Sequence, residues 1–145
     1  MLRVFVDSSV LFSAAYSSKG HARDLILMAA RAEIRLAISP MVMEETRRNL
    51  ADFAPETRPA LEQIYDAIDF EIVNPTKDDV IEAAKLVALK DAPILAAVKV
   101  ANVDMFVTLD KKHLLDRPDL EKYANTPILR PVDAYQRITG SHPGS

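Results

Sequence analysis

The sequence predicts a single α/β domain with three α/β/α layers and a largely parallel sheet. Two short apolar runs, Leu2 to Val6 and Met105 to Leu109, are rich in strand-forming residues, and an aspartate directly follows each run. Buried parallel strands have this continuous apolar pattern because helices cover both faces of their sheet. Helical and strand-like segments alternate along the whole chain with short connections, which is typical of α/β folds.

The elements follow one another in regular order. Strands are expected over residues 2–6, 35–38, 70–73, 105–109 and around 128–129. Helices are expected over residues 20–31, from Pro40 onward, through 61–68, from Lys77 to Ala88, over 94–101 and over 132–138. Ser39-Pro40 is typical of a helix start, with Ser as the N-cap and Pro at the first helical position. Thr76 and Asp79 match a capping box for the helix that follows them.

Composition narrows the class of protein. At 145 residues, with 49% hydrophobic and 27% charged residues, the chain suits one globular domain, which we expect over residues 1–140 with a flexible tail at 141–145. No segment approaches the roughly 18 consecutive apolar residues of a membrane span, and the N-terminus lacks a signal-peptide pattern. The absence of Cys excludes disulfides and thiolate sites. We therefore expect a cytoplasmic protein that is not associated with a membrane.

Four acidic residues are candidates for a shared site. Asp7 and Asp110 each follow a predicted strand, Asp91 precedes a helix that starts near Pro93, and Glu45 lies on the helix that follows Ser39-Pro40. Ligands bind in the crevice outside the carboxyl ends of parallel strands. Carboxylates gathered there repel one another unless a cation is present, so their joint placement favours a site for Mg²⁺ or Mn²⁺.

Each acid taken alone also has a simpler explanation. Asp7 and Asp91 suit helix starts, Asp110 suits a cap for the turn at residues 111–113, and Glu45 suits a solvated helix surface. The formal net charge of −3 argues against nucleic acid as a ligand. That argument is weak, because without the four clustered acids the charge becomes +1, and a bound divalent ion attracts phosphate.

Four blocks of the sequence resemble the successive blocks of the PIN-domain nucleases. They lie in the right order over nearly the whole chain, at Val4 to Leu11, Ser39 to Glu45, Asp91 to Ala97 and Val107 to Asp110. The resemblance implies a PIN-like fold. The catalytic and metal-binding residues that it implies are Asp7, Glu45, Asp91 and Asp110, with Ser9 supporting the first acid and Thr108 steadying the last.

The resemblance also implies an activity and partners. It points to a metal-dependent endoribonuclease that hydrolyses phosphodiester bonds of single-stranded RNA with Mg²⁺ or Mn²⁺. Similar proteins often serve as the toxin of a bacterial toxin–antitoxin pair, the VapC-like type, in which an antitoxin protein blocks the acidic cleft. Such proteins commonly form homodimers.

Some residues near these blocks have open roles. Glu44 adjoins Glu45, which we choose because it keeps the family's distance from Ser39-Pro40, and Asp104 precedes its strand, as a turn residue does. His113 is not required as a base when metal ions activate water. Basic residues beside the proposed ligands are candidate phosphate contacts, with solvated surface as the alternative. These are Arg47 and Lys111, with Arg48 and Lys112 beside them.

Two other functions deserve comparison. A receiver or phosphotransfer domain also places acids around Mg²⁺, but a receiver requires Asp after its third strand, where this chain has Asn74-Pro75, and a haloacid-type phosphatase requires Asp-x-Asp, where it has Asp7-Ser8-Ser9. A catalytically silent RNA-binding module is the other alternative. It receives no support from a sequence that retains all four acids.

Overall fold

The computed structural model describes residues 1–140, and its sheet is parallel throughout these residues. The strand order is β3-β2-β1-β4-β5. The strands are β1 (Arg3–Val6), β2 (Arg35–Ile38), β3 (Glu71–Ile72), β4 (Met105–Val107) and β5 (Ile128–Leu129). This arrangement confirms the predicted three-layer α/β/α architecture. The expected tail at 141–145 lies outside the described residues.

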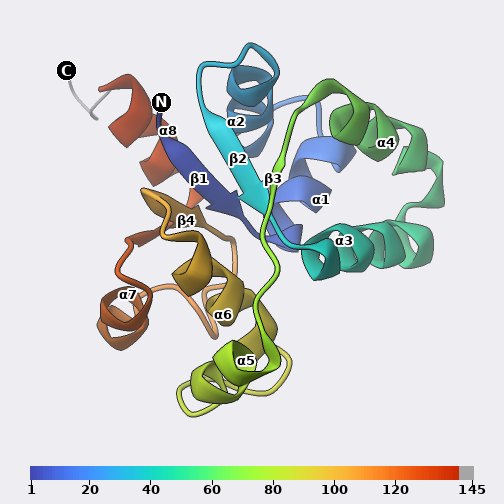
Figure 1. Cartoon of the computed structure of the whole chain (residues 1–145). Coiled ribbons are helices and arrows are strands. Elements are labelled where there is room, and N and C mark those ends of the chain that lie inside the picture. The colour runs from blue at the N-terminus through green and yellow to red at the C-terminus, as the bar shows by residue number, and fades with distance from the viewer. Residues whose placement is uncertain (141–145) are drawn as a thin grey trace.

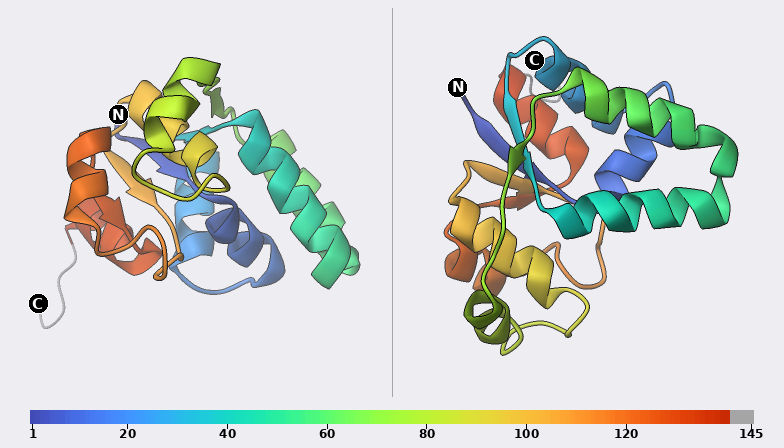
Figure 2. Two further views of the ribbon diagram at one scale, coloured as in Figure 1. Left: turned by 90° about the horizontal axis from the view of Figure 1, so that it is seen from below. Right: turned by 45° about the vertical axis from the view of Figure 1, so that its right-hand side comes forward.

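Helices cover both faces of the sheet (Figure 1). One layer holds α1 (Ser8–Tyr16), α2 (His21–Ala30) and α8 (Pro131–Thr139), and the other holds α5 (Lys77–Ala83), α6 (Ala92–Ala101) and α7 (Pro118–Ala124). Figure 2 shows α3 (Pro40–Phe53) and α4 (Arg58–Ala67) extending away from the sheet, joined through the 3₁₀ helix η1 (Pro55–Thr57). Both of these helices pack against α1.

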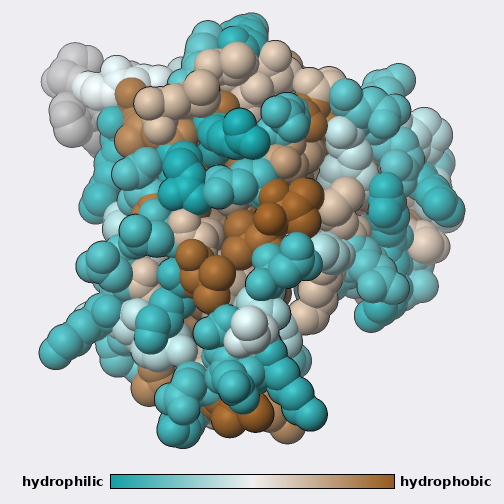
Figure 3. All heavy atoms as spheres, in the orientation of Figure 1, coloured by the Kyte–Doolittle hydropathy of each residue, from teal (hydrophilic) through white to brown (hydrophobic). Residues whose placement is uncertain are grey.

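The central strand β1 organises the core. Val4, Phe5 and Val6 are fully buried, which explains why this strand reads as an unbroken apolar run instead of an alternating pattern. The rings of Phe5 and Phe106 pack edge to face with centroids 5.7 Å apart, joining β1 to β4. The edge strand β3 is less protected: it exposes Ile72, and apolar residues gather on the face of the molecule along which β3 runs (Figure 3).

Register determines what lies at the carboxyl edge of the sheet. Val6 is paired with Val107, and the backbone N–H of Asp7 donates to the carbonyl of Val107 at 3.0 Å. Asp7 and Thr108 therefore leave their strands side by side. Because Phe5 is paired with Ala37 on β2, Ser39 and the start of α3 reach the same edge.

Several elements differ from the sequence-based expectation. The segment after Asp7 forms α1, which the sequence analysis indicated only through the alternative role of Asp7 at a helix start. Between the fourth and fifth predicted strands, where no helix was expected, lies α7, which begins at Pro118 and buries Leu120. The helix expected to continue to Ala88 ends at Ala83. Its last amides turn back through short i to i−3 bonds, as in Leu86 to Ala83, and Ala88 is exposed instead of buried. Within residues 1–140, no helix has both the length and the apolar character needed to cross a membrane.

Hydrogen bonds and an ion pair around Arg3 stabilise the opposite, amino-terminal edge of the sheet. The Arg3 guanidinium donates two hydrogen bonds to the Glu71 carboxylate, at 2.9 and 2.6 Å, and a third to the carbonyl of Ala101 at 2.8 Å. Asp104 accepts from the backbone N–H of Arg3 at 2.8 Å, which agrees with its expected place in a turn. These contacts tie β1 to β3 and to the end of α6.

The Arg3–Glu71 ion pair makes the free energy of unfolding depend on pH in a defined direction. Arg3 lowers the pKa of Glu71 below its usual value of 4.5, so the stabilisation is complete above that value and is lost as pH falls through the folded-state pKa. We predict that Glu71→Gln lowers the free energy of unfolding by about 1 kcal/mol at pH 7. The difference from wild type should shrink below about pH 4.5. Urea unfolding from pH 3 to 8 measures it, and the exposed Glu56→Gln is the control.

Candidate active site

A cleft of about 350 Å³ opens at the carboxyl edge of the sheet. It is lined by all four acids singled out in the sequence, and these come from four different elements. Asp7 precedes α1, Glu45 lies on α3, Asp91 precedes α6, and Asp110 follows β4. The remaining lining residues are Ser8, Ser9, Asn49, Lys90 and Ile94.

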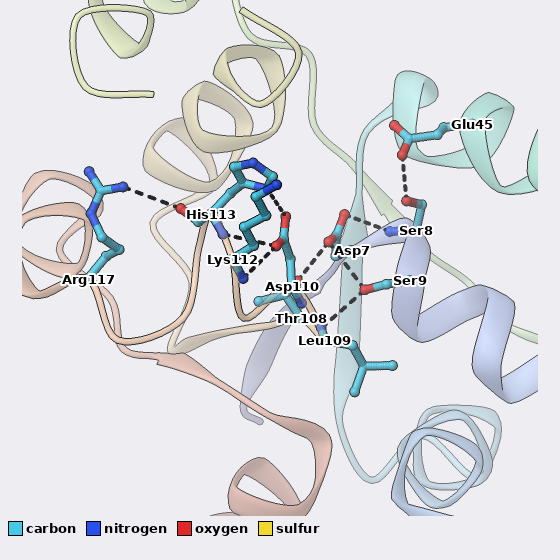
Figure 4. Close-up of polar contacts among 10 residues, drawn as sticks. All are labelled: Asp7, Ser8, Ser9, Glu45, Thr108, Leu109, Asp110, Lys112, His113 and Arg117. Carbon is cyan, nitrogen blue, oxygen red and sulfur yellow. Dashed lines mark hydrogen bonds and ion pairs between the residues drawn. The ribbon is translucent and has the colours of Figure 1, made fainter. Parts of the chain in front are cut away.

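Asp7 is the most firmly held of the four. Its side chain is buried, and one carboxylate oxygen accepts from the Thr108 hydroxyl at 2.7 Å and from the Ser9 hydroxyl at 3.3 Å. The other oxygen accepts from the backbone N–H of Ser8 at 2.8 Å, at the start of α1 (Figure 4). The carboxylate therefore has a single orientation, and the expected helix-start position and a place in the cleft are compatible.

Burial opposes the charge on Asp7. Desolvation raises the pKa of this carboxyl above its usual value, and the hydrogen bonds from Thr108, Ser8 and Ser9 offset part of that effect. The nearby carboxylate of Glu45 raises the pKa further. A positive charge in the cleft would favour the ionised form of the Asp7 carboxyl and would offset its repulsion with the Glu45 carboxylate.

Asp110 is held by the turn that it begins. One oxygen accepts from the backbone N–H groups of Lys112 and His113, at 3.1 and 3.0 Å, and the other lies 3.3 Å from the His113 ring (Figure 4). The capping interaction considered for Asp110 is therefore present, and the residue still lines the cleft. Thr108 connects this acid to Asp7, because its hydroxyl accepts from the Asp110 N–H at 3.1 Å while donating to Asp7.

Glu45, and not Glu44, faces the cleft. Ser39 caps α3 as predicted, accepting from the Val42 N–H at 3.2 Å, and this fixes which face of the helix looks toward α1. The Glu45 carboxylate accepts from the Ser8 hydroxyl at 2.9 Å. Glu44 points away and forms an exposed ion pair with Arg48.

Among the four acids, Asp91 is the one with a buried side-chain oxygen that lacks a hydrogen-bond partner within residues 1–140. It occupies the N-cap position of α6 but makes no side-chain capping hydrogen bond, in contrast to the simpler role considered for it. Although the residue is buried, its Oδ2 atom has no hydrogen-bond partner among residues 1–140. A buried carboxylate oxygen without a donor is costly, so it requires a cation, a water molecule or a substrate donor.

The donor set fits a hard divalent cation that keeps part of its water shell. All four acids supply oxygen ligands, which Mg²⁺ and Mn²⁺ prefer. In the part of the chain that the structure describes, no three Asp, Glu or His side chains are gathered tightly enough to hold an ion by themselves. Mg²⁺ is typically held by one or two carboxylates plus water and substrate phosphate, so this spacing suits such binding.

The cleft contains polar residues that sequence reasoning did not single out, and it omits others. Lys90 and Asn49 line it, and their positions offered a signal, since Lys90 directly precedes Asp91 and Asn49 lies one helical turn after Glu45. Arg47 and Lys111, expected to contact phosphate, do not line this cleft. The Arg47 guanidinium is engaged by the Glu62 carboxylate at 2.8 and 3.1 Å.

Fold and cleft together define an α/β domain with an acidic site at the carboxyl edge of its parallel sheet. The chain belongs to the PIN domain family, whose model matches residues 4–120. Members of this family are generally nucleases and are typically dependent on divalent metal ions. This match confirms the resemblance to the PIN-domain nucleases that the four sequence blocks indicated.

Solved structures show the same fold at low sequence identity. PAE2754 from Pyrobaculum aerophilum has a TM-score of 0.68 and 18% identity, over 97% of this chain and 91% of that chain. VapBC2 from Rickettsia felis, bound to a DNA fragment from its promoter, has a TM-score of 0.63 and 11% identity, over 89% of this chain and 98% of that chain. No curated protein matches the sequence closely enough to count as a relative.

The burial of Asp7 predicts a stability change that grows with pH. Because the folded-state pKa is raised, the favourable contribution of the neutral carboxyl is complete below its usual value of 3.8 and is lost as pH rises through the folded-state value. Asp7→Asn keeps a neutral group there at every pH. We predict that the variant, without metal, is at least as stable as wild type at pH 7 and loses this advantage toward pH 4.

Urea unfolding with a chelator from pH 3.5 to 8 tests this prediction. The control is Asp52→Asn, which removes a charge from an exposed position on α3. An Asp7→Asn variant that is less stable than wild type by more than about 1 kcal/mol at pH 7 would show that capping of α1 outweighs desolvation.

Proposed function

We propose that this protein is an endoribonuclease that uses Mg²⁺ or Mn²⁺ to hydrolyse phosphodiester bonds of single-stranded RNA. The observation that carries the proposal is the convergence of Asp7, Glu45, Asp91 and Asp110 on one cleft, with a buried Asp91 oxygen that has no partner among the described residues. A divalent ion bound there supplies an activated water and neutralises charge on the phosphate.

The protein's own residues would hold and align that chemistry. Asp7 and Asp91, which are buried, together with the less enclosed Glu45 and Asp110, would hold the ion through their carboxylate oxygens. Thr108 keeps the Asp7 carboxylate in one rotamer and restrains the Asp110 backbone. This restraint reduces the reorganisation needed when substrate arrives.

Lys90 is the cation that we assign to the substrate phosphate. It lines the cleft beside Asp91, and its side chain is exposed. An ammonium group there partly offsets the four carboxylates and attracts a negatively charged backbone. Asn49 adds a neutral amide that can donate to a phosphate oxygen or to a sugar hydroxyl.

The biological setting that we propose is a cytoplasmic toxin–antitoxin pair, with this chain as a homodimeric toxin. The fold likeness to the toxin–antitoxin complex VapBC2 supports a protein partner for this chain. An antitoxin that covers the acidic cleft would prevent RNA from reaching Asp7 and Asp91, which gives a direct physical means of inhibition.

Metal-dependent cleavage is the principal test. Purified protein should cleave a fluorescent single-stranded RNA in Mn²⁺ or Mg²⁺ and stop when the metal is chelated. Glu45→Gln and Asp91→Asn should each lower kcat/KM roughly a hundredfold or more, as expected for groups that position metal or move protons. Glu44→Gln is the matched control, because its carboxylate points away from the cleft.

Cleavage that is equal in wild type and in Asp91→Asn, prepared in the same way, would contradict the proposal and indicate a contaminating ribonuclease. Full activity in chelator would contradict the metal requirement. If DNA is cleaved and RNA is not, the nuclease assignment stands and the RNA specificity is wrong.

Lys90 gives a second, separate prediction. Lys90→Ala should lower kcat/KM about tenfold, because one charge-assisted phosphate contact is lost. Lys90→Arg should keep most of the activity. Lys77→Ala, which removes the same charge from an exposed position on α5, is the control. An unchanged kcat/KM in Lys90→Ala would remove Lys90 from the site.

A further inference from the structure

A second hollow of about 330 Å³ lies next to the candidate active site. It is formed where α1, the start of α2, the loop after β4 and the start of α8 meet. The lining residues that concern the argument are Ser13, His21, Leu109, Lys111, Arg130 and Val132.

The acidic cleft and the second hollow are separated by a single wall, which residues 109–111 and α1 form. Asp110 lines the acidic cleft, while its neighbours Leu109 and Lys111 line the second hollow. On α1, Ser9 lines the cleft and Ser13, about one helical turn later, lines the second hollow, a spacing of about 6 Å along the axis. The wall is fixed by the Leu109 N–H, which donates to the Ser9 hydroxyl at 3.1 Å. The second hollow therefore directly adjoins the acidic cleft across this wall.

The chemistry of the second hollow suits a nucleotide. Its lining is mainly apolar, with Leu109 and Val132 side chains and the ring of His21, and Leu109 is 43% exposed although it is a large hydrophobic residue. Apolar and ring surfaces bind the face of a base without selecting its sequence. Lys111 and Arg130 supply positive charge on the same lining, which suits the phosphate attached to that base.

Lys111 is the more available of the two cations. Arg130 is engaged by the Asp133 carboxylate at 2.9 Å, whereas Lys111 is exposed and has no ion pair within residues 1–140. A third hollow shares Lys111 and Arg130 in its lining, but it also contains the acids Asp116, Glu121 and Asp133. Those acids repel phosphate, so the second hollow is the more favourable direction for an RNA strand.

We propose that the second hollow binds the nucleotide adjacent to the scissile phosphate, with its base against Leu109 and Val132 and its phosphate beside Lys111. This inference rests on the proposed function, since it assigns a place to the next nucleotide of the same single-stranded RNA. It predicts one base position, at a constant distance from the cleaved bond, that contributes to binding.

Direct binding provides the first test, and it does not require cleavage. A fluorescein-labelled single-stranded octaribonucleotide is titrated with the whole protein in chelator, and the Kd is measured by anisotropy. Lys111→Ala and Ser13→Phe, which fills the hollow, should each weaken binding about tenfold. The matched control is Lys112→Ala, which removes the same charge from the next residue. Lys112 lines none of these hollows, and its contact with Asp110 comes from the main chain.

An abasic scan provides the second test. A single abasic site is moved along the oligonucleotide, and kcat/KM in Mn²⁺ is measured for each position. In wild type, one position should lower kcat/KM about tenfold, and in Ser13→Phe that position should no longer differ from its neighbours. Circular dichroism and melting show whether Ser13→Phe is folded, and Lys111→Ala gives the same readout without added bulk.

The outcomes separate this inference from the proposed function. Cleavage of RNA with no sensitive abasic position, or with equal Kd values for Lys111→Ala and Lys112→Ala, would overturn the second site alone. Weaker binding by Lys111→Ala than by Lys112→Ala, with no cleavage in any metal, would overturn the nuclease activity and keep the site. Absence of both binding and cleavage would overturn both.

Discussion

The hydrogen bond from the Thr108 hydroxyl to the Asp7 carboxylate, 2.7 Å long, is the contact on which the candidate site depends. It joins the ends of β1 and β4, and it forms only because Val6 and Val107 are paired in register. A slip of one residue would turn the side chains at the end of one strand to the opposite face. It would thereby separate Asp7 from Thr108 and Asp110. Such a slip is costly because it would move Arg3 or Asp7, which flank the fully buried residues Val4, Phe5 and Val6, into the core of the sheet. The same strand register therefore determines both the packing of the core and the geometry of the site.

The cleft combines buried negative charge with incomplete internal compensation. Asp7 receives three hydrogen bonds and still has a raised pKa, and one oxygen of buried Asp91 has no partner among residues 1–140. A cluster of this kind reduces stability unless something binds it, since a ligand stabilises the folded state to which it binds. The amino-terminal edge of the sheet shows the opposite situation, because the bidentate Arg3–Glu71 pair there is fully matched. One edge is therefore built for stability and the other for binding.

Positive charge is distributed around the cleft in a way that suits a polyanion. Lys90 lines the cleft itself, and Lys111 and Arg130 line the hollow beside it, so cations follow the carboxyl edge of the sheet. Arg47 has no part in this distribution because Glu62 and the ring of Tyr65 engage its guanidinium. Of the two basic residues that the sequence offered as phosphate contacts, Lys111 lines the hollow beside the cleft and Arg47 lines neither the cleft nor that hollow. Whether a basic residue can contact the substrate depends on the direction of its side chain and on its existing partners.

Sequence alone determined the α/β class, the order of the five strands along the chain, the caps at Ser39 and Thr76, and the four acids that line the cleft. These follow from local signals, namely apolar runs, capping residues and the acids that follow two of the predicted strands or lie near helix starts. Tertiary structure decided the bridging role of Thr108, the presence of Lys90 in the cleft and the helices α1 and α7. Those features depend on helix phase, strand register and burial, which arise only when segments far apart in the chain pack together.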